Sequence, residues 1–279
     1  MTTQVSANPL HSHFRQPAIY LKLPTSGKYW PEDSINLPDS GEIPVYSMTA
    51  KDEILLKTPD ALMNGEGIVG VIQSCVPNIL DPWQIPISDL DSILIAIRLA
   101  SYGQEMDITS TCPECKEQNE NVVDLNMLLD TLPAPTYPAK VYGKLTVQFK
   151  PQNFKSLNLT NLAVFEQQSL LASISSSTLT DEQKQAEFKK LLPKITNLTI
   201  QTLIDAIESI TPEGGEAVVD RAFIREFIDN CDRKTYEDCK AQIEKTAQAN
   251  KTQPLSIECS ACQKAYKSPL SFENSNFFV

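Results

Sequence analysis

The stretches TCPEC, residues 111–115, and ECSAC, residues 258–262, decide the fold predicted for this chain. Each contains a Cys-x-x-Cys pair, Cys112 with Cys115 and Cys259 with Cys262. Two cysteines at this spacing can point both thiolates into one site from a tight turn, which supplies half of a tetrahedral metal shell. We therefore predict that the two pairs meet around a structural Zn2+ ion, with one ion per chain.

Both pairs lie between short segments of strand-like composition. Ile108 precedes the first pair and Val122 follows it, while Ile257 and Tyr266 flank the second pair. This composition places each pair at the tip of a β-hairpin, and two such hairpins facing each other form a zinc ribbon. Because residues 116–258 separate the pairs, far more than the usual spacing of about 15–20 residues, the prediction requires a domain inserted between the hairpins.

The sequence leaves other roles for the four cysteines open. Their thiols can be free on two surface turns, or form a reversible disulfide. A redox-active pair is disfavoured, because that chemistry needs the first cysteine at the start of a helix, and no helical pattern follows either pair. Zinc and iron are not distinguished. In the zinc interpretation, four thiolates close the shell and leave no position for a substrate, so the ion stabilises the fold.

Composition excludes several classes of protein. The 279 residues, 41% of them apolar, suffice for a sizeable core. The net charge of -11 repels a phosphate backbone, so nucleic acid is not expected as a partner. The most apolar stretch, residues 93–100, is too short to cross a membrane. No signal segment is seen, and the odd number of cysteines favours a reducing compartment, so a soluble protein made in a cytoplasm is expected.

The predicted fold class is α+β, with four parts along the chain. They are a flexible N-terminal arm (1–17), a mixed α/β domain with the first knuckle (18–151), a mainly helical insertion of about five helices (152–250), and the second knuckle with an aromatic tail (251–279). The insertion is predicted from apolar residues at helical spacing, including residues 199–210. The alternative, one continuous domain, stays open.

Several elements are predicted within these parts. Residues 37–56 are expected to form turns and short extended segments, residues 58–63 to start a helix, and residues 139–151 to form a strand. A helix from Ser88 to Gly103 should be buried nearly all round, so Arg98 within it needs a carboxylate or carbonyl partner. Cys75 is expected to be a buried apolar residue, whereas Cys231 and Cys239 have no partner at ligand spacing.

Aromatic residues near the ends and turns are candidates for docking to partners. They are Tyr29, Trp30, Trp83, Phe272, Phe277 and Phe278, together with the arm from Pro9 to Arg15. The alternative for each of them is ordinary packing in the chain's own core.

No catalytic constellation is found in the sequence. The stretch GEGIVG, residues 65–70, matches a dinucleotide-binding pattern, but a helix start precedes it where a strand is required. His11 and His13 are the only histidines, and both lie in the predicted arm. Catalysis needs preorganised groups, so we expect a protein that is not an enzyme.

The stretches IYLKLPTSGKYWP (19–31), MTAKDEILLKTPDALMNG (48–65) and ILIAIRLASYG (93–103), followed by CPEC, resemble the baseplate hub proteins of contractile-tailed, T-even-type bacteriophages. The resemblance covers residues 18–126. It implies a tail component or assembly factor without catalytic residues, whose partners are other baseplate hub proteins or the tape measure protein. Such a protein would be found in the host cytoplasm during assembly and, if retained, in the tail baseplate of the virion.

Two functional hypotheses follow from the resemblance. The protein can be a structural hub subunit that stays in the particle, or a soluble tail assembly chaperone that leaves it. A zinc-ribbon adaptor for transcription is a weaker alternative, because such ribbons present basic residues. The sequence leaves the copy number open, and a homo-oligomer is among the options.

Overall fold

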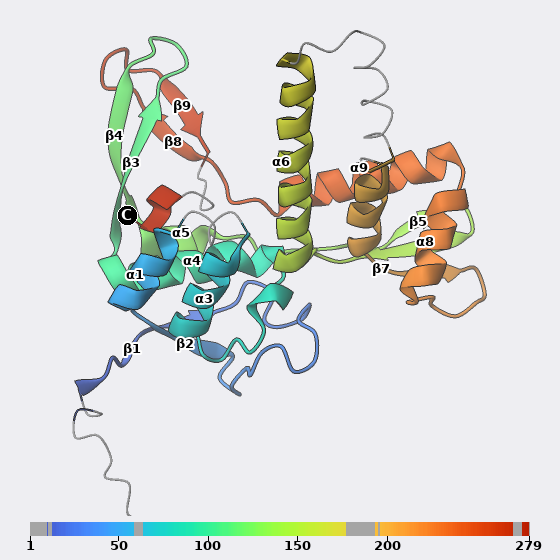
Figure 1. Cartoon of the computed structure of the whole chain (residues 1–279), viewed down its shortest axis with the longest axis horizontal. Helices are drawn as coiled ribbons and strands as arrows, with labels where there is room; N and C mark the ends of the chain where they lie inside the picture. The colour runs from blue at the N-terminus through green and yellow to red at the C-terminus, as the bar shows by residue number, and fades with distance from the viewer. Residues whose placement is uncertain are drawn as a thin grey trace, which may run out of the picture.

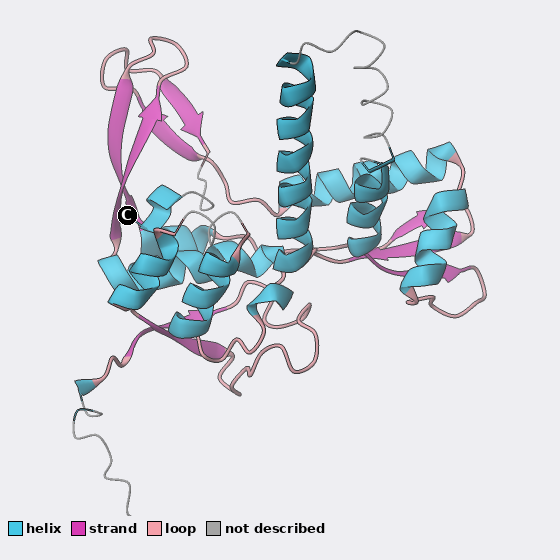
Figure 2. Ribbon diagram, viewed as in Figure 1, coloured by secondary structure: helices cyan, strands magenta, loops and turns pink. Residues whose placement is uncertain are grey.

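The computed structural model describes residues 10, 13–58, 64–176, 193–194, 196–269 and 275–278. The fold is α+β, as predicted, and the described strands form small antiparallel sheets (Figures 1 and 2). The strands are β1 (Pro17–Lys22), β2 (Glu42–Tyr46), β3 (Glu105–Thr111), β4 (Gln118–Asp124), β5 (Lys140–Tyr142), β6 (Leu145–Phe149), β7 (Ile207–Pro212), β8 (Leu255–Glu258) and β9 (Ala265–Ser268).

Two hydrophobic cores organise the helices around these sheets. In Figure 1 the elements of the first core lie on the left and those of the second on the right, with α6 rising between them. The helices are α1 (Ala50–Leu56), α3 (Glu66–Cys75), α4 (Ile87–Tyr102), α5 (Leu125–Thr131), α6 (Phe154–Ser176), α8 (Arg221–Asn230) and α9 (Arg233–Ala249), with short 3-10 turns η2 (Pro82–Gln84) and η3 (Ser275–Phe278). None of the described helices has the length and apolar character needed to span a membrane.

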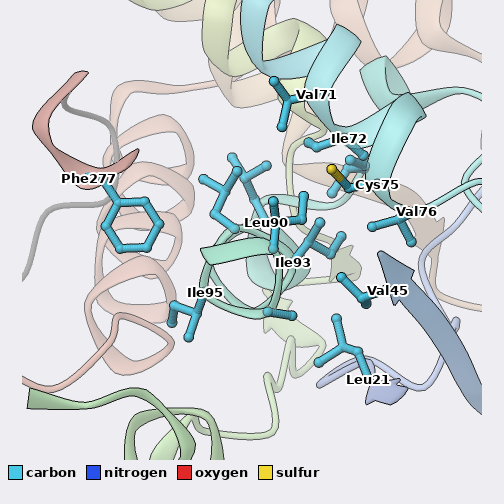
Figure 3. Close-up of a cluster of buried hydrophobic side chains, with 14 of the residues drawn as sticks. Leu21, Val45, Val71, Ile72, Cys75, Val76, Leu90, Ile93, Ile95 and Phe277 are labelled. Carbon is cyan, nitrogen blue, oxygen red and sulfur yellow. The ribbon is translucent and has the colours of Figure 1, made fainter. Parts of the chain in front are cut away.

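Helix α4 is the centre of the first core. Ile93, Ile95 and Ile97 are completely buried, as the predicted all-round apolar pattern requires. The β1–β2 hairpin packs against the helix and contributes Leu21 to this core (Figure 3). Its cross-strand partner Ile43 is buried in the same core. The other helices of this core, α1, α3 and α5, complete a body that surrounds α4.

A buried carboxylate ties the N-terminal turn to α4. Asp89 accepts hydrogen bonds from the backbone N–H of Thr25 at 2.9 Å, from the Thr25 hydroxyl, and from Nε1 of Trp30 at 2.7 Å. Burial raises the pKa of Asp89, while the bonds from Thr25 and Trp30 lower it, and the net shift is upward. Trp30 therefore serves the chain's own packing.

Replacing Asp89 with alanine is expected to destabilise the protein by about 2–4 kcal/mol, because it leaves buried donors of Thr25 and Trp30 without an acceptor. Chemical denaturation followed by tryptophan fluorescence measures this change. The matched control is Asp39→Ala, since Asp39 is exposed, and it should shift the midpoint very little. An equal effect of the two substitutions would contradict the assignment.

The second core is built on the β5–β6–β7 sheet. Val147 pairs with Ile210 across β6 and β7, and Phe149 pairs with Ile207 after a register shift. Their side chains are buried together with Ile224 of α8, and the helical residues 196–205 and α9 cover the same cluster. The strand predicted over residues 139–151 thus exists as β5 and β6, and it packs with the mainly helical part of the chain.

The prediction of a helix through residues 199–210 is wrong at its C-terminal end. The helix ends at residue 205, and residues 207–212 form β7. Ile207 and Ile210 are buried because β7 pairs with β6. The tertiary contact with β6, rather than the local spacing of apolar residues, therefore makes this segment a strand. The domain limits at residues 17, 151 and 250 stay a prediction.

The C-terminal phenylalanines pack into the first core. Phe277 and Phe278 are each 5% exposed, and Figure 3 shows the Phe277 ring facing the α4 side of this core. Arg98 donates to the carbonyl oxygen of Phe277, and its guanidinium lies 5.5 Å from the Phe277 ring centroid. The buried arginine thus has the carbonyl partner that the sequence analysis required. Phe272 lies outside the described residues.

Arg15, near the N-terminal end of the described residues, is anchored on the first core. Its guanidinium donates to the carbonyl oxygens of Ser47 and Ser74, the latter at 2.5 Å, and forms an ion pair with Asp52 at 3.7 Å. Arg15 was predicted to belong to a mobile arm, but these contacts hold it on the body. The buried carboxylate of Asp52 explains why, since an unpaired charge there would be costly. Pro9 and His11 lie outside the described residues.

Candidate metal centre

The two Cys-x-x-Cys turns have the same local geometry. The β3–β4 hairpin pairs Thr111 with Gln118 beside the first turn, and β8–β9 pairs Glu258 with Ala265 at the equivalent place. In each turn the N–H of the first cysteine donates to the carbonyl five residues later, at 2.9 Å from Cys112 and 3.0 Å from Cys259. Both hairpins therefore form from their own sequences, as predicted.

Each turn closes through a left-handed residue directly after its second cysteine. Lys116 has φ 64° and Gln263 has φ 58°. The N–H of Lys116 donates to the carbonyl of Cys112, and that of Gln263 to Cys259. This conformation aims both sulfur atoms of a turn to the same side, which is the arrangement that a metal shell needs.

The four predicted cysteines come together at the tips of the two hairpins, which lie side by side in Figure 1. Their Sγ atoms all lie within 4.8 Å of one another. The Sγ atoms of Cys112 and Cys262 are 3.8 Å apart, and those of Cys115 and Cys259 are 3.5 Å apart. Metal–sulfur bonds of about 2.3 Å in a tetrahedron place sulfurs about 3.8 Å apart, whereas a disulfide requires about 2.05 Å. The spacing fits four thiolates around one ion.

Asn119 joins the two hairpins behind the sulfur atoms. It is 4% exposed, and its Nδ2 donates to Sγ of Cys259 at 3.6 Å. Its Oδ1 accepts from the backbone N–H of Ser260 at 2.8 Å and from the Ser260 hydroxyl at 2.9 Å. The amide side chain of Asn119 in the first hairpin thus orients the second turn, as residues that hydrogen-bond to metal ligands do in metal sites.

Two further contacts hold the hairpins together. The hydroxyl groups of Ser110 and Tyr266 share a hydrogen bond of 2.6 Å along the strands. At the tips, Lys264 and Glu114 form an exposed ion pair of 2.9 Å. The exposed pair contributes little, about 0–1 kcal/mol, so the alignment of the hairpins rests chiefly on Asn119, the Ser110–Tyr266 bond and the cysteine cluster.

The electrostatics of the cluster favour a cation. The backbone N–H groups of Cys262 and Ala261 stabilise the Cys259 thiolate and lower its pKa to about 6. The backbone N–H of Glu117 also lowers the pKa of Cys115, but the three neighbouring sulfurs and burial together outweigh it, so that this pKa rises to about 12. The first thiolate forms easily, and its negative charge then disfavours the ionisation of a neighbouring thiol. A divalent cation bound between the sulfur atoms would remove this charge repulsion.

Cys75 and Cys239 are buried in the hydrophobic cores, and Gly70 allows close packing of two helices. Cys75 is buried in the first core, as predicted, and burial raises its pKa to about 11. Cys239 is buried in the second core. Gly70 of the GEGIVG stretch packs against α1, where an added Cβ would lie 2.5 Å from Leu55, so the motif serves helix packing. Within the described residues, the four clustered cysteines form the group that could hold a metal ion.

Asn119 was missed in the sequence analysis. No spacing rule singles out a polar residue four positions beyond a Cys-x-x-Cys pair as a partner of the other knuckle. The four ligand candidates, in contrast, were all found from their repeated spacing.

Comparison with known protein families identifies the family to which the chain belongs. Residues 30–279 match the protein family described as T4 bacteriophage base plate protein. The matched range includes both Cys-x-x-Cys turns, the whole second core and most of the first core. No significant match is found among curated proteins or among solved structures.

Proposed function

Because the chain belongs to the family of T4 bacteriophage base plate proteins, we propose that it acts in building the hub of the tail baseplate, through protein–protein contacts and without catalysis. The observation that carries this proposal is the family match over residues 30–279, which include both knuckles and nearly all of both cores. The cysteine cluster supports a structural role for the protein, since four thiolates around one ion would leave no open coordination position for a substrate.

We propose that the cluster binds Zn2+ through Cys112, Cys115, Cys259 and Cys262. The sulfur spacing supports this assignment, as does the tetrahedral preference of zinc for thiolates. The ion would join residues near the middle of the chain to residues near its C-terminal end, and would hold the two hairpins as one rigid projection. A rigid projection is a suitable docking surface in a multisubunit assembly, because little conformational entropy is lost when it binds.

Asn119→Ala tests the support of the metal shell. We expect metal affinity to fall about 10–100-fold while the ion still binds, because the substitution removes the bond to Cys259 and the link to Ser260 but no ligand. Competition with a chromogenic chelator measures the affinity. Asn126→Ala is the matched control, since Asn126 is exposed on α5, and it should bind like wild type. Unchanged affinity in Asn119→Ala would remove Asn119 from the site.

The partners we propose are other hub proteins or the tape measure protein. Exposed apolar side chains support contacts with other chains, among them Leu159 and Phe165 on the projecting helix α6, which are 55% and 53% exposed (Figure 1). The net charge of -11 argues against nucleic acid as a partner. Salt-sensitive binding of the purified protein to DNA would instead favour a transcription adaptor.

Mass spectrometry of purified particles and of infected-cell lysate tests the proposal. A hub subunit should be found in mature virions in a fixed ratio to other baseplate proteins. An assembly chaperone should be abundant in lysate and missing from particles, and in that case the alternative function replaces the structural one. Finding the protein in neither baseplates nor their assembly intermediates would contradict both.

A further inference from the structure

A small polar cavity lies where the two cores meet. It has a volume of about 120 Å³ and is lined by Gln84 and Asn153 near the first core and by Lys150 and Arg221 of the second part, with Ser156 in the first turn of α6. At about 30 Å³ per water molecule, the cavity has room for about four waters. A phosphate or a carboxylate group needs space of this order.

Lys150 and Arg221 bring two positive charges to this cavity, against one negative charge from Asp205. Lys150 and Arg221 form no ion pair in the part of the chain that the structure describes. Asp205 also lines the cavity, but its Oδ1 accepts from Gln201 at 2.8 Å. Burial lowers the pKa of Lys150, and the positive charge of Arg221 lowers it further, while Asp205 and Glu208 act in the opposite direction. An added anion would relieve the repulsion between the two cations.

The guanidinium of Arg221 is held in position before any ligand arrives. Its Nη1 donates to the carbonyl oxygens of Ile204 at 3.2 Å and Ile207 at 2.5 Å, where the helix ends and β7 begins. Among the residues that the structure describes, no acceptor is found for Nε or Nη2 of this side chain. A fixed guanidinium suits oxyanions, because its planar donors match carboxylate and phosphate oxygens.

Neutral donors complete the surroundings. Gln84 accepts from Nδ2 of Asn153 through its Oε1 at 2.9 Å, which leaves the Nε2 group of Gln84 to donate. The hydroxyl of Ser156 lines the same cavity. Two cations and two neutral donors outnumber the single carboxylate of Asp205 around this small space, an arrangement suited to binding negative oxygen atoms.

We propose that this cavity binds a small oxyanion between Lys150 and Arg221, either free phosphate or the carboxylate of an acidic side chain on a partner. The bound anion bridges Lys150, which directly follows β6, and Arg221 of α8 to Gln84 of η2, and so fixes the two parts of the chain relative to each other. In an assembly, an acidic side chain of a neighbour would insert at this junction.

Thermal unfolding of the full chain in phosphate and in acetate, each against chloride at equal ionic strength, tests the proposal. Binding to the folded state raises the unfolding midpoint in a saturable way. Lys150→Gln should need at least about tenfold more anion for the same shift, because one charge-assisted contact is lost. Lys144→Gln is the control: its side chain is 87% exposed and pairs with Glu213, so this variant should respond like wild type.

The outcomes separate the possible sources. A saturable response to phosphate alone assigns the site to a tetrahedral anion, whereas a response to acetate as well supports a partner's carboxylate. Phosphate also stabilises proteins non-specifically, and that effect is shared by every variant. Equal responses in wild type and Lys150→Gln therefore overturn the proposal, as does the absence of any saturable response. Arg221→Gln gives a second test. If the Arg221→Gln variant does not fold, the result from Lys150→Gln alone decides the question.

Discussion

Cys112→Ser or Cys262→Ser is expected to abolish metal binding and to unfold the two-hairpin ribbon. Serine offers no thiolate, and either change opens a shell whose sulfur atoms lie within 4.8 Å of one another. Metal binding to structural zinc sites contributes about 10–16 kcal/mol of apparent folding free energy in small peptides, which exceeds what two short hairpins can supply. Metal analysis should find one equivalent of zinc in wild type and almost none in either variant.

The loss should spread beyond the ribbon. Ile108 and Leu255 of the two hairpins pack against the first core, so unfolding the ribbon exposes part of that core and lowers the thermal midpoint of the whole protein. Cys231→Ser is the matched control, because this partly buried cysteine lies outside the cluster, and it should retain the metal. Wild-type protein that is free of metal and loses no stability in EDTA would contradict the zinc assignment.

Removing the C-terminal phenylalanines should produce the second large effect. Phe277 and Phe278 are nearly fully buried, and burial of each ring is worth about 3–5 kcal/mol in a Phe→Ala substitution. The double variant Phe277→Ala with Phe278→Ala is therefore expected to lose at least about 5 kcal/mol, measured by chemical denaturation. Phe223→Ala, which alters a ring that is 62% exposed, serves as the control.

Deletion of residues 275–279 separates the rings from the carbonyl group. The Phe277→Ala chain keeps the carbonyl that accepts from Arg98, whereas the deletion leaves this buried guanidinium without that partner. The deletion should therefore cost more than the double substitution, by about 1–3 kcal/mol. Adding Arg98→Met to the deletion should recover part of the loss, since the unpaired charge is then removed. No recovery would show that the carbonyl bond has little weight.

The most predictable features depended on residues close together in the sequence. Helix α4 was predicted from its apolar residues and from the glycine that ends it, and Gly103 has a positive φ of 92°, a conformation that favours glycine. Helix α1 was missed, although Thr49 and Asp52 form a capping box with bonds in both directions. The Thr-x-x-Asp spacing was readable, but the turn-rich residues before it led to an expectation of extended segments for residues 37–56.

Other features of the fold depended on contacts between residues that are distant in the sequence but adjacent in the structure. Ile207–Pro212 has apolar residues that suit either a helix or a strand, and the free edge of β6 decides for the strand. The sequence suggests Trp83 and the terminal phenylalanines as residues that dock to a partner protein, but all three pack within the chain itself. Trp83 stacks on Phe154 at 5.5 Å, and Phe277 and Phe278 enter the first core. An exposed apolar surface and a buried one have the same composition, so only the neighbours distinguish them.

The sequence by itself determined which four cysteines form the cluster, because a Cys-x-x-Cys turn builds its own hydrogen bonds and aims both sulfurs within a few residues. It also determined the central buried helix, through its apolar spacing and the glycine that ends it. The tertiary structure decided that Asn119 supports the second knuckle, that Arg98 bonds to the C-terminal segment, and that Lys150 and Arg221 share a cavity. Each of these joins residues more than 50 positions apart, and the free energy of such a contact depends on packing that no local pattern encodes.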